Sequence, residues 1–172
     1  MDSMRRLLLC VLFGALLLLG AQAAFAANEI VVTVTLQQIG VDVSPTSWPL
    51  GVMAPTTSQS SWVSTVAGYF GATNTGNVPV DFTIEPGSTS PSGWTAETSV
   101  AVDDYVIGFG IGTEPYTTEP AYTTFTGSTS LATGVAAAET VDFDLEFTAP
   151  ATGSTYDAGG ESFTVSLGAS PS

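Results

Sequence analysis

Basic and nucleophilic side chains are almost absent from this 172-residue sequence. It has no histidine, its only two basic residues are Arg5 and Arg6, and its one cysteine is Cys10. Beyond residue 10 the side chains needed for a Ser-His-Asp or Cys-His arrangement, a lysine Schiff base or a zinc site are therefore absent. Nothing remains to clamp a phosphate by charge. We predict that the protein is not an enzyme and has no catalytic residues. A glycosidase-like carboxylate pair is the one formal alternative.

The acidic residues have almost no basic partners, and the formal net charge is −14. Such a surface repels nucleic acid and anionic lipid, so we predict neither as a partner. Calcium is the one ion that these oxygen ligands suit. Asp142, Asp144 and Glu146 alternate along an expected strand, where residues i and i+2 lie about 6.6–6.8 Å apart. We therefore read them as a solvated strand face and predict no cofactor, with calcium as the alternative.

The N-terminus has the features of a secretory signal peptide. Two arginines precede the apolar run Leu7–Gly20, and Ala24-Phe25-Ala26 fits a cleavage site. We predict that residues 1–26 are a signal peptide cleaved near Ala26, and that residues 27–172 form one secreted, extracellular or cell-surface domain. A retained membrane anchor is the alternative, because the apolar run with its small-residue end is just long enough to span a bilayer.

Alternating apolar and polar residues predict short strands along most of residues 27–172. The clearest runs are Val78–Ile84, Tyr105–Ile111 and Val141–Phe147. No window shows a sustained 3.6-residue apolar period, so no significant helix is expected there. About eight or nine short strands with turn signals between them predict an all-β fold, an antiparallel β-sandwich.

The stretch Ala72–Ile84 is predicted to be a hairpin or a sheet corner, and we favour the hairpin. Alternating runs lie on both sides of Asn74-Thr75-Gly76-Asn77. Glycine and asparagine tolerate a positive φ, which tight hairpin turns require.

Several segments resemble secreted bacterial immunoglobulin-like repeats and the ASH (abnormal-spindle/hydin) class. They are Val41–Gly51 (VDVSPTSWPLG), Ala72–Ile84 (ATNTGNVPVDFTI), Val141–Pro150 and Ser162–Leu167. The resemblance implies an immunoglobulin-like sandwich and a binding or structural role rather than catalysis, by analogy at the level of the fold. The chain departs from the pattern by an extra alternating segment, Ile30–Gln37, ahead of the usual first strand.

The extra segment leads to our main functional hypothesis. Its apolar positions are Ile30, Val32, Val34 and Leu36. Once freed by signal cleavage, such a segment is able to add to the sheet of a neighbouring subunit, and repetition head to tail gives a fibre. We therefore predict a non-enzymatic structural or surface module that self-associates. The alternative for this segment is pairing within its own chain.

The Thr/Pro/Tyr-rich loop Thr113–Thr126 suggests a second function. Its aromatic residues Tyr116, Tyr122 and Phe125 are candidates for recognising a glycan or another extracellular protein. The alternative is that these aromatic side chains anchor a surface loop or belong to the core.

Overall fold

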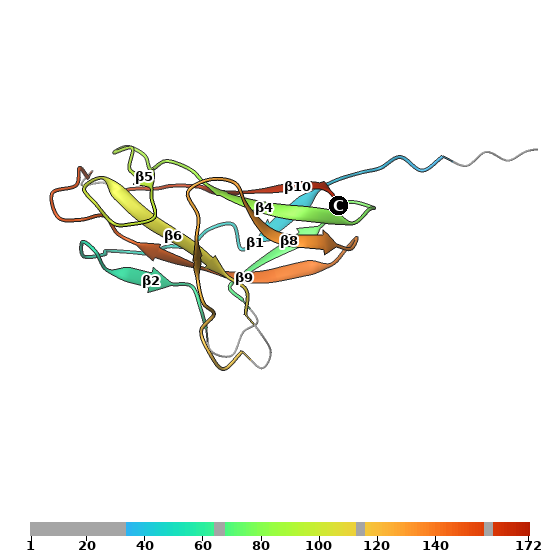
Figure 1. The fold of residues 1–172 in the computed structure, drawn as a ribbon, viewed down its shortest axis with the longest axis horizontal. Helices are drawn as coiled ribbons and strands as arrows, with labels where there is room; N and C mark the ends of the chain where they lie inside the picture. Colours follow the sequence, from blue (N-terminus) through green and yellow to red (C-terminus); the bar gives the residue numbers. More distant parts are fainter. Residues whose placement is uncertain (1–33, 64–67, 113–115, 157–159) are drawn as a thin grey trace, which may run out of the picture. The chain divides into compact units, whose positions relative to one another are not determined.

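The computed structural model describes residues 34–63, 68–112, 116–156 and 160–172. The predicted signal peptide, and Ile30 and Val32 of the N-terminal segment, lie outside these residues. The chain divides into two units, residues 1–35 and 36–172, and the fold is that of the second. The described part of this unit contains ten strands and no helix (Figure 1).

The strands form two sheets. In the larger sheet the order is β1-β3-β9-β6-β5; β2 also pairs with β9, and β7 with β6. These strands are β1 (Val41–Ser44), β2 (Ser58–Ser60), β3 (Phe70–Asn74), β5 (Thr95–Ala96), β6 (Asp104–Gly110), β7 (Thr123–Thr124) and β9 (Thr140–Thr148). The smaller sheet has the order β10-β4-β8, with β4 (Val80–Pro86), β8 (Thr129–Val135) and β10 (Val165–Pro171). All pairs are antiparallel except the two-residue pair β5–β6.

The hydrophobic core lies between the two sheets, as the two-residue alternation predicts. From the smaller sheet, Val80, Phe82 and Ile84 are fully buried. The larger sheet faces them with Phe70 and Ala72, with Tyr105, Ile107 and Phe109, and with Phe143, Leu145 and Phe147. Burying one such side chain stabilises the fold by about 1.5–3 kcal/mol. The all-β sandwich predicted from the sequence is confirmed.

Tyr105 has a polar role as well as a packing role. Its hydroxyl donates a hydrogen bond to the carbonyl oxygen of Gly87, just after β4. Burial raises the pKa of Tyr105 to about 12, so the phenol stays protonated and able to donate at any physiological pH. The bond therefore ties β6 of the larger sheet to the smaller sheet.

The predicted hairpin at Ala72–Ile84 is wrong, and the sheet corner is correct. β3 pairs with β1 and β9, whereas β4 pairs with β10 and β8, so the turn between β3 and β4 carries the chain from one sheet to the other. No residue of the turn 74–77 has a positive φ. Gly76 is required for another reason, because a Cβ there would clash with the carbonyl oxygen of Gln38.

Asn74 organises this corner from inside the protein. Its side chain is fully buried. Its Nδ2 donates to the carbonyl oxygens of Val78 (2.8 Å) and Val135 (2.9 Å), and its Oδ1 accepts from the Gly76 N–H (2.9 Å). One side chain thus satisfies backbone groups of the turn and of β8, and it fixes the path between the sheets.

Three further strands were not predicted from the sequence. β7 lies within the predicted loop Thr113–Thr126, and no strand was expected at β2 or β8. β8 is hard to detect because only Leu131 and Val135 point into the core, and Gly134, with φ 65°, interrupts the alternation. β2 has no apolar residue at all; it pairs with β9 through its backbone and through a hydrogen bond between the Ser58 and Thr148 hydroxyls.

Candidate functional site

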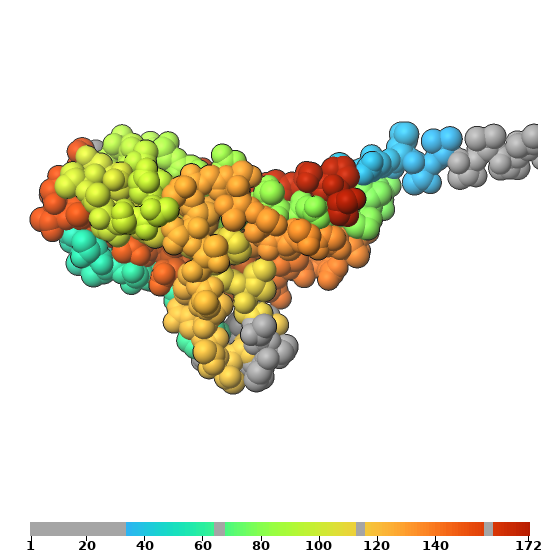
Figure 2. Space-filling model, viewed as in Figure 1, coloured from blue at the N-terminus to red at the C-terminus, as the bar shows by residue number. Residues whose placement is uncertain are grey.

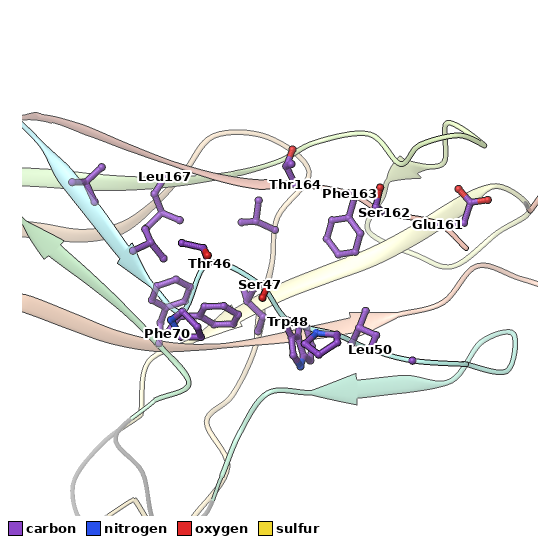
Figure 3. Close-up of a pocket in the computed structure, with 18 residues that line it drawn as sticks. Thr46, Ser47, Trp48, Leu50, Phe70, Glu161, Ser162, Phe163, Thr164 and Leu167 are labelled. Carbon is purple, nitrogen blue, oxygen red and sulfur yellow. The ribbon is translucent and has the colours of Figure 1, made fainter. Parts of the chain in front are cut away.

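An apolar groove opens along one seam of the sandwich, between the edge strands β1 and β10. Its volume is about 670 Å³. Val41, Val43, Trp48 and Leu50 line one wall, and Phe163, Val165 and Leu167 line the other, with Phe70, Phe143 and Leu145 also contributing (Figure 3). Glu161 is the only charged residue among the described residues that line it. The groove is therefore an opening into the hydrophobic core of a strongly acidic protein.

The strands on both sides of this groove have one unpaired edge. β1 pairs only with β3, and β10 pairs only with β4, among the described strands. Just before β10, the backbone of Ser162 exchanges hydrogen bonds with that of Ser90, and the Thr164 carbonyl oxygen accepts from the Gly87 N–H. Gly87 and Ser90 follow β4, so these backbone groups face the β4 side. Backbone groups alternate between the edges of a strand, so those of Phe163, Val165 and Leu167 face the open edge. An unpaired apolar edge of this kind is a template for another strand.

We call Ile30–Gln37 the N-terminal arm; the structure describes its residues 34–37. These four residues belong to no strand. Val34 is 75% exposed and Leu36 is 80% exposed. Leu36 and Gln37, which belong to the same unit as the sandwich, therefore form no strand with it. Exposing these two apolar side chains to water is unfavourable, and burial against a partner would remove this unfavourable exposure.

The end of the arm and the residues just after it are fixed by the β3–β4 turn. The Asn77 side chain donates to the Leu36 carbonyl oxygen and accepts from the Gln38 N–H, both at 2.8 Å. The Asn77 N–H donates to the Gln38 carbonyl oxygen (3.0 Å), and the Thr75 N–H donates to that of Gly40 (3.1 Å). Residues 36–40 are thus held along the turn and lead directly into β1.

The three aromatic candidates of the Thr/Tyr-rich loop occupy different environments. Phe125 is only 2% exposed and packs edge-on against Phe109 in the core. Tyr122 is half-buried, and its hydroxyl donates to Glu119 Oε1 (3.1 Å). Tyr116 is half-buried with φ 53°. The loop before β7 (golden yellow) projects from the rest of the visible surface (Figure 2). Tyr116 and Tyr122 are the two candidates with accessible surface.

The predicted solvated face of β9 is wrong at Asp144. This carboxylate is only 1% exposed. Its Oδ1 accepts from the Tyr69 N–H (3.1 Å) and the Ser61 hydroxyl (3.2 Å), whereas its buried Oδ2 has no hydrogen-bond partner among the described residues. Burial raises the pKa of Asp144; the two hydrogen bonds oppose this, and the nearby charges of Glu119 and Asp142 add to it. The alternating pattern could not reveal that the other face of β9 is covered here.

Within residues 34–172, apart from the three gaps, no three or more His, Cys, Asp and Glu side chains are grouped to hold a metal ion. The same residues include no helix that is long and apolar enough to cross a membrane.

Comparisons with known proteins give no relative. No protein-family model, no curated protein and no solved structure matches this chain significantly.

Proposed function

We propose that this protein is a non-enzymatic structural subunit of an extracellular or cell-surface assembly, which joins copies of itself by donating its N-terminal arm. The observation that carries this proposal is that one chain contains both an apolar segment outside any strand and a sandwich with unpaired strand edges. The arm exposes Val34 and Leu36 outside any strand, and the sandwich has unpaired edge strands beside an apolar groove. We also retain the immunoglobulin-like resemblance as a proposal about the fold family, and export through the signal peptide as a proposal about location.

The shortage of reactive side chains supports a structural role. Residues 11–172 contain no Cys, His, Lys or Arg, and the groove is lined by apolar, hydroxyl and proline residues with one carboxylate. Such a lining offers no nucleophile–base pair. The apolar part of the lining is suited to receive every second side chain of an added β-strand.

Removing the arm is the direct test of this function. We expect the exported protein to form filaments or large oligomers, visible by electron microscopy and by light scattering. Deleting residues Ala27–Gln37 should leave particles of monomer size, because a head-to-tail assembly loses its only donor. Purely monomeric intact protein at all concentrations would contradict self-assembly, and unchanged filaments after the deletion would contradict donation by the arm.

A second proposal is a binding module that recognises a glycan or a protein through the Thr/Tyr-rich loop. The observation in its favour is Tyr116, a non-glycine residue held at φ 53°, because such backbone conformations cluster at ligand-binding sites. If this is correct, Tyr116→Ala should lower binding on a glycan array or to a captured partner about tenfold or more. Tyr156→Ala, which removes a 76% exposed tyrosine from another loop, is the matched control. Equal binding by both variants would remove the support for this proposal.

A further inference from the structure

We propose that the groove between β1 and β10 is the acceptor for the N-terminal arm of a second copy. In this complex the segment Ile30–Leu36 adds to the free edge of β10 as a fourth strand of the smaller sheet. Its apolar side chains then enter the groove toward Phe70 and Phe143. This inference rests on the proposed function and specifies which surface receives the donated strand.

The length of the groove matches the length of the segment. Lining residues of the β10 wall run from Glu161 to Leu167, which is seven residues, or roughly 23 Å of extended chain. The segment Ile30–Leu36 also has seven residues. A fully extended segment therefore reaches along this whole wall.

The side-chain pattern of the segment matches the groove as well. In an extended strand, residues 30, 32, 34 and 36 point to one face, and they are Ile, Val, Val and Leu. Residues 31, 33, 35 and 37 point to the other face, where Val, Thr, Thr and Gln suit a partly solvated sheet surface. Pairing with the free backbone groups of Phe163, Val165 and Leu167 directs one of these faces into the core.

The distribution of charge is compatible with contact between these two surfaces. The chain carries a net charge of −14, so two copies repel each other over most of their surfaces. The segment Ile30–Gln37 contains no charged residue, and Glu161 is the only one in the groove lining. The donor segment and the acceptor groove are thus nearly free of charge, so little electrostatic repulsion opposes their contact.

A second copy fits this acceptor better than the arm of the same chain does. The arm leads through residues 36–40, which are held along the turn by Asn77 and Thr75, straight into β1 at the groove wall. To enter its own groove the chain would have to reverse direction just before Leu36. Residues 28–38 contain no glycine or proline, which are the residues that tight reversals favour. A head-to-tail contact from one copy to the next extends into a fibre when its rotation does not close it into a ring.

The first experiment changes only the apolar face of the arm. The variant carries Ile30→Thr, Val32→Thr and Val34→Thr, which keeps β-branched residues and the full chain length. We expect the apparent dissociation constant from analytical ultracentrifugation to rise about a hundredfold or more. Val31→Thr, on the opposite face, is the control and should assemble as the original protein does. Equal assembly by the triple variant and the control would overturn the proposal.

The second experiment locates the acceptor by disulfide trapping, for which the absence of cysteine after Cys10 is convenient. Val34→Cys protein is mixed under mild oxidation with one of three β10-wall variants, Phe163→Cys, Val165→Cys or Leu167→Cys. At least one should give a covalent heterodimer, because Cα atoms of neighbouring strands lie within disulfide range. Ser166→Cys, an exposed position between them, should cross-link several-fold less.

The outcomes separate this inference from the function beneath it. Filaments that form without any β10 cross-link would keep the structural function and refute this acceptor. Intact protein that stays monomeric would refute both, and would indicate that the exposed arm serves a different partner. Cross-linking at Ser166 as strong as at the groove positions would show contact without insertion, which also refutes the proposal.

Discussion

Replacing Asn74 by alanine should destabilise the sandwich by about 2–4 kcal/mol. The variant leaves the buried carbonyl oxygen of Val135 without its donor, and it removes the bonds to Val78 and Gly76 that shape the corner. A buried backbone group without a partner costs the full price of its desolvation. Equilibrium unfolding in urea measures the effect as a lower midpoint at an unchanged slope.

Asn77→Ala is the matched control for this corner. Asn77 lies in the same turn and also makes two side-chain hydrogen bonds, but it is exposed. Water replaces the lost partners there, so the expected loss is below about 1 kcal/mol. If the two variants lost equal stability, burial of Asn74 would not be what holds the corner.

Replacing Asp144 by asparagine should stabilise the protein at pH 8 by about 1–3 kcal/mol. The charged form of Asp144 is buried with Oδ2 unpaired, and no basic side chain exists beyond Arg6 to neutralise it. Asparagine keeps an oxygen to accept from Tyr69 and Ser61, and it removes the buried charge. Urea unfolding at pH 8 measures the gain.

The same carboxyl gives the protein a pH dependence with a definite sign. Burial raises the pKa of Asp144 in the folded state above the value of about 3.9 expected in the unfolded chain. The folded state therefore holds its proton more tightly, so this contribution to stability is fully present below about pH 4 and is lost as the pH rises through the folded pKa. The free energy of unfolding should fall with increasing pH over that window, and it should fall less steeply in Asp144→Asn.

General charge repulsion gives a slope of the same sign, so the test needs a control with the same change in net charge. Glu146→Gln removes one negative charge from the same strand, at a side chain that is only half-buried. We expect it to retain the pH slope of the original protein. A slope that both substitutions reduce equally would assign the effect to net charge rather than to Asp144.

Local pattern was sufficient for the strands that form the core. Val80, Phe82 and Ile84 alternate with polar residues, as do Phe143, Leu145 and Phe147, and both sets are buried as predicted. Because successive side chains of a strand point to opposite faces, this alternation gives each strand one apolar face, and packing against the other sheet buries it. β2 and β7 were not predicted because they have no apolar residue, and β8 was not predicted because its buried residues Leu131 and Val135 do not follow a period of two.

For the candidate sites as well, the sequence identified some features and only the tertiary structure revealed the others. The sequence identified Val34 and Leu36 as the apolar face of an additional segment, and the structure leaves both exposed. It gave no sign of the groove, because residues from four separate parts of the chain line it. It also misplaced Asp144, since the cover over that carboxylate comes from Ser61 and Tyr69, more than 70 positions earlier in the chain.

Composition and period alone therefore determined that this is an acidic, all-β protein with few reactive groups, because those properties are local to each residue and its neighbours. Which strands pair was decided only by tertiary structure. The turn at residues 74–77 looks like a hairpin locally, but the buried hydrogen bonds of Asn74 to Val78 and Val135 send β4 into the other sheet. That crossing separates β1 from β10 into different sheets, and the seam between their unpaired edges is where the groove opens.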